Sequence, residues 1–533
     1  MPTTEITPTH TRPSHSSSSG SSTTREKEKD AEINVTTTSR PESTASDRTT
    51  VPVPLSMKLI SILLVSLIGF GGHWSSGVTG AMKSTLKKEL KINNTKYALL
   101  TSSQDFMVTV LILFSGMWTD RVGGASAMLY GNALFSVGSI LIAGAAQCRS
   151  FKFMIFGTVV ESLGDIATQV AQYKIFSSWF PPSAGFAATL GFELGIGKIG
   201  SFVGKSSANI IAKNTGDFAW VYWTAVFMNI FTNVATLVFW FFTKYANKKF
   251  HGTNDPATGE KLTESNKKFE IRKVLELPWT FWMVMLFTAF QTSTAIVFSQ
   301  NSTELAEQRF NVDSIKAGWY SAMTQYIGFF LVPLLGVFID ILGNRITVFA
   351  VVGLGCFLAM ILIAFGKTVG ATAAAFGIYG VAYSFGPTVI IDGIRTTMHY
   401  QGVFGSAYAI KIAINNSMNI IIAMITGALQ DADNDSYDRA VIVYAADSAA
   451  ACCVVLVMVV LCFRSVDMRS LQWTRKQRIA RGHIINERKE FNTTGEQYER
   501  NKKISGVFFG LVCLLIVGAW AAYIWGAATG NNY

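Results

Sequence analysis

The chain has 533 residues, of which 50% are hydrophobic and only 15% are charged, and its formal net charge is +11. This composition is typical of a multi-pass membrane protein, not of a soluble one. The basic residues lie between apolar segments, so orientation in a bilayer explains them and no nucleic-acid partner is expected. The six cysteines lack the spacing of a disulfide framework or a metal site, and we expect neither a metal nor a cofactor.

Apolar segments of helical length alternate with polar or basic stretches along the chain, which predicts an all-α membrane protein. The expected division is a disordered cytosolic tail (1–54), an N-terminal six-helix bundle (55–243), a cytosolic basic linker (244–276), a C-terminal six-helix bundle (277–463), a cytosolic basic stretch (464–503) and a thirteenth transmembrane helix (504–526).

Basic residues indicate the orientation in the membrane. The two basic stretches belong in the cytosol with the N-terminal tail, because cytosolic loops carry an excess of Lys and Arg. The loop 81–96 is also basic, although the segment count places it on the other side. We accept this exception because three non-cytosolic loops contain sequons, which predict glycosylation at Asn93, Asn301 and Asn434. The thirteenth helix then places Tyr533 on the non-cytosolic side.

One loop motif ends both the second and the eighth predicted helices. Its copies cover 116–124 and 336–345, with a separation of 220 residues. A single copy would be an ordinary tight turn, but two copies at equivalent places indicate an internal repeat. The glycines permit close helix packing, and each aspartate can cap or pair with a neighbouring helix end. The candidate residues for conformational change are Gly116, Asp120, Arg121, Gly123, Asp340 and Arg345.

The motif and the segment pattern resemble the major facilitator superfamily, whose loop signature after helix two is G-x-x-x-D-R-x-G-R-R. The resemblance covers roughly 55–463. It departs from the family at Gly124, where the signature has Arg, and at Ile341, which replaces the first Arg in the second copy. It implies two six-helix bundles around a site at the membrane midplane, working by alternating access.

Polar residues form stripes along the predicted fourth, fifth and eleventh helices. Ionisable side chains in lipid-compatible segments cost at least a few kcal/mol each, so they normally face a partner or a water-filled cavity. At about 1.5 Å per residue, Glu161 and Lys198 both fall near the midplane. The candidate substrate-binding residues are Glu161, Asp165, Gln169, Lys198, Lys411 and Asn415. The alternative is a structural salt bridge from Glu161 to Lys198 that only holds the N-terminal bundle together.

Three local segments are similar to those of the lysosomal dipeptide uniporters within this superfamily. They are Glu161-Ser162, Ser178-Trp179-Phe180 and Gly197-Lys198-Ile199-Gly200-Ser201. In that family a Glu on helix four and an Arg on helix five are associated with dipeptide binding, and they match Glu161 and Lys198. Lysine keeps the charge but loses the bidentate fork of arginine. The resemblance also implies a lysosome-like membrane and, as partners, a second copy or a glycosylated accessory subunit.

These observations favour a facilitative uniporter that exports dipeptides or similar small zwitterions from a lysosome or vacuole to the cytosol. The plasma membrane is the alternative location. Two other functions stay open: a carrier of monocarboxylates or other small organic solutes, and a nutrient receptor that binds without transporting. We expect no enzyme, because the sequence has no nucleophile–base pairing, metal-ligand cluster or phosphate-binding loop.

Overall fold

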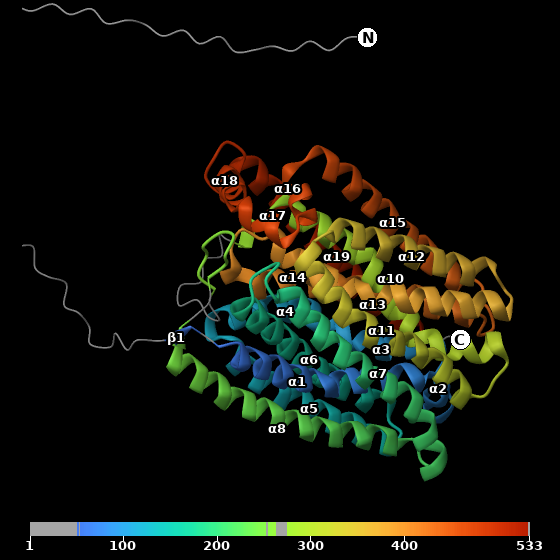
Figure 1. The fold of residues 1–533 in the computed structure, drawn as a ribbon. Coiled ribbons are helices and arrows are strands. Elements are labelled where there is room, and N and C mark those ends of the chain that lie inside the picture. The colour runs from blue at the N-terminus through green and yellow to red at the C-terminus, as the bar shows by residue number, and fades with distance from the viewer. Residues whose placement is uncertain (1–50, 53, 252–253, 263–273, 531–533) are drawn as a thin grey trace, which may run out of the picture. The chain divides into compact units, whose positions relative to one another are not determined.

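The computed structural model describes residues 51–52, 54–251, 254–262 and 274–530. The predicted tail, 1–54, lies outside the described residues except at 51–52 and 54, and so does 263–273 of the predicted linker. Long helices dominate the part of the chain that is described (Figure 1). Besides helices it contains one short parallel pairing, between β1 (Val51–Pro52) and β2 (Phe250–His251).

The N-terminal bundle is built from six long helices, of which the second is broken into two parts. Its elements are α1 (Leu55–Ala81), the short α2 (Lys83–Leu90), α3 (Asn94–Phe106) with α4 (Val108–Val122), α5 (Gly124–Gln147), α6 (Phe151–Trp179), α7 (Phe186–Thr215) and α8 (Ala219–Lys249).

The C-terminal bundle repeats this plan and is followed by shorter helices. Its elements are α10 (Trp279–Phe310), α11 (Ser314–Leu342), α12 (Arg345–Phe365), α13 (Val369–Thr397), η1 (Gln401–Val403), α14 (Phe404–Ala432) and α15 (Ala440–Arg464). After them come α16 (Val466–Arg469), η2 (Ser470–Gln472), α17 (Arg475–Ala480), α18 (Gly482–Thr493) and α19 (Tyr498–Thr529).

Several of these helices begin where a side chain can cap them. Asn93, Ser150, Asp313 and Thr368 accept hydrogen bonds from the first-turn backbone N–H groups of α3, α6, α11 and α13, respectively. Such caps satisfy donors that the helix itself leaves free. The polar residues between apolar segments therefore determine where these four helices start.

Twelve helices in the described part of the chain are long and apolar enough to cross a membrane, by length and composition, when α3 and α4 count as one. The long helix outside this set is α6, which has 29 residues and carries Glu161, Asp165 and Lys174. These ionisable residues lower its hydropathy, but α6 packs closely along α5 within the N-terminal bundle. The thirteen predicted segments therefore all form helices.

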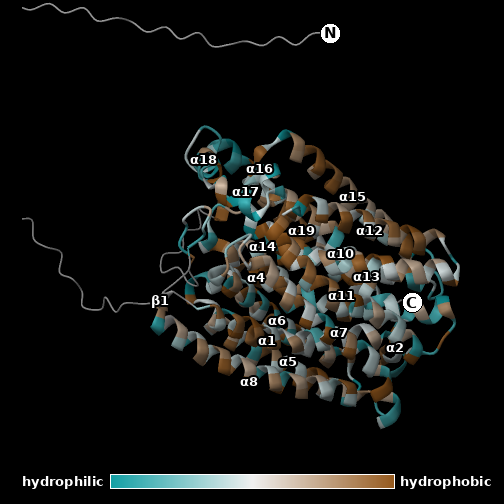
Figure 2. Ribbon diagram, viewed as in Figure 1, coloured by the Kyte–Doolittle hydropathy of each residue, from teal (hydrophilic) through white to brown (hydrophobic). Residues whose placement is uncertain are grey.

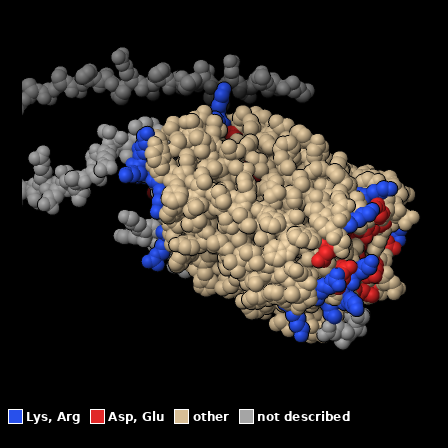
Figure 3. Space-filling model, turned by 90° about the horizontal axis from the view of Figure 1, so that it is seen from below, with Lys and Arg blue, Asp and Glu red and all other residues tan. Residues whose placement is uncertain are grey.

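The hydrophilic residues concentrate at two ends of the helices. Figure 2 shows hydrophilic colours around α17 and α18 and again around α2, with apolar residues along the long helices between them. On the face seen in Figure 3, most Lys, Arg, Asp and Glu side chains likewise gather at two ends. We call these ends the α17 end and the α2 end. The apolar band between them is the part suited to lipid.

The two bundles meet mainly along two helix pairs. Helix α14 packs against α3 and α4, and α11 packs against α7. Each pair therefore joins a helix of one bundle to a helix of the other.

The structure differs from one predicted boundary, because helix α8 continues to Lys249, beyond the predicted bundle limit at 243. The stretch 464–503, which the sequence predicts only to be basic and cytosolic, forms α16 to α18 and the start of α19. Its basic residues have individual partners: Arg478 binds Asp255 of the linker at 3.2 Å, and both side chains are buried. A count of positive charges could not reveal such a partner 223 residues away.

Helix α19 packs on the outside of the bundles, against α14 and α3. Its aromatic residues also contact neighbouring helices of the N-terminal bundle. The ring of Tyr523 stacks on that of Phe106 at 4.1 Å, and Trp520 Nε1 donates to Thr109 Oγ1 at 2.9 Å. At the α2 end Asn93 Nδ2 donates to the carbonyl of Gly530 at 3.3 Å. The helix therefore runs from the α17 end to the α2 end.

Candidate functional site

A cavity of 330 Å³ lies between the two bundles. Its walls come from α1, α3, α5, α6 and α7 on one side and α10, α11, α13 and α14 on the other. The residues predicted to bind substrate all line it: Glu161, Asp165, Gln169, Lys198, Lys411 and Asn415. The three polar stripes of the sequence therefore converge on one site.

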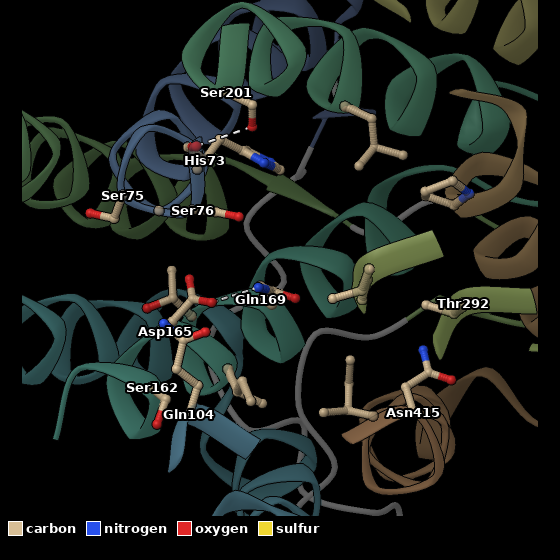
Figure 4. Close-up of a pocket in the computed structure, with 18 of the residues that line it drawn as sticks. His73, Ser75, Ser76, Gln104, Ser162, Asp165, Gln169, Ser201, Thr292 and Asn415 are labelled. Atoms are coloured by element: carbon tan, nitrogen blue, oxygen red, sulfur yellow. Dashed lines mark hydrogen bonds between the residues drawn. The ribbon is translucent and has the colours of Figure 1, made fainter. Parts of the chain in front are cut away.

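The close-up in Figure 4 shows Asp165 and Gln169 across the cavity from Thr292 and Asn415. Gln169 Nε2 donates a hydrogen bond to Asp165 Oδ2 at 2.8 Å, drawn as a dashed line. The wall formed by α6 thus presents a carboxylate that is bound by a neutral amide.

Two further carboxylates line this cavity, those of Glu161 and Glu193. Glu193 accepts a hydrogen bond from the hydroxyl of Tyr173 at 3.3 Å, and His73 Nε2 lies 3.8 Å from its other oxygen. Among the described residues, no Lys or Arg forms an ion pair with either glutamate. This side of the cavity can therefore accept a cation.

The two lysines of α7 extend toward the opposite bundle. Lys198 Nζ donates to Gln325 Oε1 at 2.9 Å and lies 3.9 Å from the centroid of the Tyr383 ring. Lys205 Nζ donates to the carbonyl oxygen of Ser299 at 2.8 Å. The structure therefore does not contain the alternative salt bridge from Glu161 to Lys198, because Lys198 is held by neutral groups of the C-terminal bundle.

Lys411 on α14 differs from both. Its Nζ has no hydrogen-bond or ion-pair partner among the described residues, and it lies 5.4 Å from the centroid of the Tyr408 ring. Asn415, one turn further along α14, accepts a hydrogen bond from Thr288 Oγ1 at 3.3 Å.

The first copy of the repeated motif holds the start of a helix in the other bundle. Asp120, at the end of α4, accepts hydrogen bonds from the backbone N–H groups of Gly405 at 3.0 Å and Ser406 at 2.8 Å. These are first-turn donors of α14, which the helix cannot satisfy itself. Asp120 also pairs with Lys174 of α6 at 2.9 Å, and both charged side chains are fully buried.

The second copy makes the equivalent contact. Asp340, at the end of α11, accepts hydrogen bonds from the backbone N–H groups of Ala187 at 3.4 Å and Ala188 at 2.6 Å, at the start of α7. Arg345, at the start of α12, is fully buried and pairs with Asp392 of α13. The internal repeat is therefore visible as two reciprocal caps between the bundles.

The glycines of the motif allow these helices to approach. A Cβ on Gly116 would lie 2.5 Å from the Cβ of Ala409, and one on Gly336 would lie 2.4 Å from the carbonyl oxygen of Ala187. Gly123 ends α4 with a φ of 98°, which favours glycine. Arg121, the remaining predicted residue of this set, is exposed at the helix end.

Comparisons with known proteins agree with this architecture. The family profile described as Major Facilitator Superfamily matches residues 62–415. The chain belongs to this superfamily. The solved structure of the superfamily's proton:xylose symporter XylE, bound to 6-bromo-6-deoxy-D-glucose, superposes with a TM-score of 0.58 at 12% identity, over 80% of this chain and 98% of that one. This likeness shows the fold alone.

Curated relatives carry a more specific name. The Lysosomal dipeptide transporter MFSD1 of Homo sapiens is 30% identical over 156 residues, which is 28% of this chain and 33% of that protein. The chain therefore spans about a third of the length of that relative. The protein of the same name from Mus musculus is 21% identical over 394 residues, or 72% of this chain and 82% of that protein.

The family confirms several predictions made from the sequence. The major facilitator fold, multi-pass membrane insertion and transport of a small-molecule solute are those of the superfamily. Members of the superfamily are transporters and not enzymes, so the expectation that this chain is no enzyme is also confirmed.

Contacts between the bundles also occur at the α2 end of this transporter. Lys83 of α2 is almost fully buried, and its Nζ lies 2.7 Å from Glu304 Oε2 of α10. Asp431, at the end of α14, accepts a hydrogen bond from the backbone N–H of Thr95 at 2.8 Å. The bundles are thus joined by contacts at both ends of the helices.

The structure contradicts one of the three predicted glycosylation sites. Asn301 is buried within α10, where its Oδ1 accepts from Lys83 Nζ at 2.7 Å and its Nδ2 donates to Tyr444 Oη at 3.2 Å. A glycan on that nitrogen has no room. Asn434 is exposed and Asn93 is partly exposed, and both stay predictions.

The sequence stripes missed several residues that line the cavity. Glu193 and Asp105 are charged residues within predicted apolar segments, so the criterion that identified Glu161 could have found them. Gln325 and Tyr383 carry no charge, and only the packing of the two bundles shows that they contact a lysine.

Proposed function

We propose that the protein carries dipeptides or similar small zwitterions across its membrane by alternating access. The observation that supports this proposal is the separation of charge within one cavity. Four carboxylates and three lysines line it, and no carboxylate–lysine pair joins them among the described residues: Asp105, Glu161, Asp165, Glu193, Lys198, Lys205 and Lys411. Buried charges normally require opposite charges nearby. A ligand with one ammonium and one carboxylate group would supply both.

The dimensions of the cavity favour a small ligand. Small-molecule sites usually measure about 300–1,000 Å³, and 330 Å³ falls at the lower limit. A monocarboxylate fits less well, because it would leave the four carboxylates without compensation. A receptor that does not transport is disfavoured by the contacts between the bundles at both ends, which are suited to opening one side at a time.

The relatives and the distribution of charge support the proposed membrane and direction of transport. The relatives' printed name supports a lysosomal membrane. We propose a lysosomal or vacuolar location, with export to the cytosol as a uniporter. We place the α17 end in the cytosol, because the basic stretch and the described part of the linker around Asp255 lie there. The α2 end then faces the lumen, where a second copy or a glycosylated subunit would have access to it.

Uptake by proteoliposomes containing the purified protein tests this proposal. A panel of radiolabelled dipeptides, single amino acids and lactate should give saturable uptake of dipeptides that needs no imposed pH gradient. Empty liposomes and competition by unlabelled dipeptide are the controls. Uptake of lactate alone would contradict a zwitterion carrier, and binding of dipeptide without uptake would indicate a receptor.

A further inference from the structure

The three lysines of the cavity differ in how many acceptors they already have. An ammonium group offers three N–H donors. Lys205 has acceptors for all of them: its Nζ lies 2.8 Å from Ser299 O, 3.2 Å from Ser299 Oγ and 3.0 Å from Ser302 Oγ. All three donors of the Lys205 ammonium group therefore already have acceptors on α10, and these contacts join α7 to α10.

Lys198 is also engaged across the bundles. It donates to Gln325 Oε1 on α11, and the face of Tyr383 on α13 lies against its charge at 3.9 Å. Such a cation–π contact stabilises an ammonium that is shielded from water. A ligand carboxylate could reach Lys198 only in competition with these groups.

Lys411 has an ammonium group with no acceptor among the described residues, although its side chain is partly buried and lines the cavity. A charged donor in such a position loses water without gaining a protein partner, which is costly. An acceptor supplied by the ligand would remove that cost.

Two residues near Lys411 on α14, Asn415 and Asn416, have side-chain amide nitrogens that can donate hydrogen bonds to a ligand. The Oδ1 of Asn415 accepts a hydrogen bond from Thr288 Oγ1, so the NH₂ group of Asn415 remains able to donate. Asn416 Nδ2 is buried in the cavity wall and has no acceptor among the described residues. An ammonium group beside amide donors is a set that suits a carboxylate.

From this arrangement we infer that Lys411, and not Lys198, binds the carboxylate of the substrate. The inference rests on the proposed transport of zwitterions. The ammonium group of the substrate then faces the carboxylates of α6, Glu161 and Asp165, in the other bundle. The substrate therefore bridges the bundles, whereas Lys198 acts as a positioning residue that holds α7 against α11 and α13.

The test compares a dipeptide with its C-terminal amide, which has the same size but no carboxylate. Dissociation constants are measured by calorimetry on the purified, full-length protein. The wild type should bind the dipeptide on the order of tenfold or more tightly than the amide, because a charge-assisted hydrogen bond is lost. In Lys411→Met this ratio should fall to about one. Lys198→Met is the matched control: it should keep the ratio while transport turnover falls.

Other outcomes would overturn the inference. If Lys411→Met keeps the ratio and Lys198→Met removes it, Lys198 binds the carboxylate. Lys411→Arg keeps the charge and should keep the ratio, so an Arg variant that loses it while melting like the wild type would also contradict us. A wild type that binds the dipeptide and its amide equally overturns the assignment but not zwitterion transport. A wild type that binds no dipeptide overturns the proposed function and the assignment together.

Discussion

Replacing Asp120 with asparagine tests whether the reciprocal caps control the opening of the transporter. Asparagine keeps only one of the two acceptor oxygens, so the hydrogen bond from Gly405 to Oδ1 or that from Ser406 to Oδ2 can persist, but not both. The substitution removes the negative charge beside Lys174, whose side chain is fully buried. The change therefore removes the charge together with one acceptor of the cap, and the equivalent substitution at Asp340, which also loses one acceptor, separates the two effects.

The structure limits the size of this effect. A buried ion that loses its only partner costs about 3–5 kcal/mol. Lys174 keeps two acceptors, the carbonyls of Gln401 at 3.3 Å and Gly402 at 2.7 Å. We therefore expect a loss near that of one charged hydrogen bond, about 2–3 kcal/mol, which shifts the equilibrium away from the closed α17 end roughly 30- to 150-fold. Turnover should fall by a similar factor with little change in substrate affinity, since Asp120 lies outside the cavity.

Asp340→Asn is the matched control. Asp340 also caps a helix of the other bundle, but among the described residues no Lys or Arg forms an ion pair with it. Its replacement should cost about 1 kcal/mol or less, a change in turnover of at most about fivefold. The sequence repeat alone predicts equal effects for the two variants.

Initial rates in proteoliposomes, measured beside dissociation constants, decide between these expectations. Equal slowing of both variants would refute the role given to Lys174. Unchanged turnover in both would show that the repeated motif serves folding only.

Four further predictions concern the cavity, the α17 end and α19. Glu161→Gln and Lys198→Ala should each lower dipeptide transport about tenfold or more without changing the melting temperature much, and a double variant that regains transport would show that the two residues act as a structural pair. Burial raises the pKa of Asp255, but the charge of Arg478 lowers it further, so the net pKa lies below the ordinary aspartate value. Asp255 therefore stabilises the fold at pH values above its ordinary pKa, and it loses this contribution as the pH falls through its lower folded-state pKa. Asp255→Asn should lower the melting temperature at about pH 7 and much less at about pH 3. Equal shifts in melting temperature at the two pH values would contradict this reasoning. Deleting 504–533 should leave dipeptide binding intact, since α19 lies outside the cavity, and loss of binding would show that α19 supports it. A C-terminal tag should resist protease added from the cytosolic side.

The helices and much of the candidate site could be predicted from the sequence for a simple physical reason. A charged residue in a lipid-compatible segment must face protein or water, and the helical period fixes which residues share its face. This reasoning identified Glu161, Gln169 and Lys411 as candidate site residues, and in the structure all three line one cavity. The motif aspartates could be expected to cap a helix, but the sequence did not show which helix.

Pairings between distant segments could not be predicted in this way. Lys198 contacts Gln325 only because α7 packs on α11, and nothing near either residue encodes that pairing. Asn301 satisfies the sequon pattern, yet its burial depends on Lys83, 218 residues earlier in the chain. Local rules describe a segment, whereas these contacts depend on where the other bundle lies.

The two aspartate caps have a consequence for how the halves of the protein can diverge. In the opposite bundle, apart from the hydroxyl of Ser406, each aspartate accepts hydrogen bonds from main-chain N–H groups, which every residue except proline provides. The helix starts that they hold, Gly405-Ser406 and Ala187-Ala188, accordingly have different sequences. After duplication of an ancestral half, the aspartate of each copy could keep its hydrogen bonds to the helix start of the other copy while the side chains of that helix start changed. Chimeras that join halves from distant relatives should therefore preserve this closure, provided that no proline replaces a donor at either helix start.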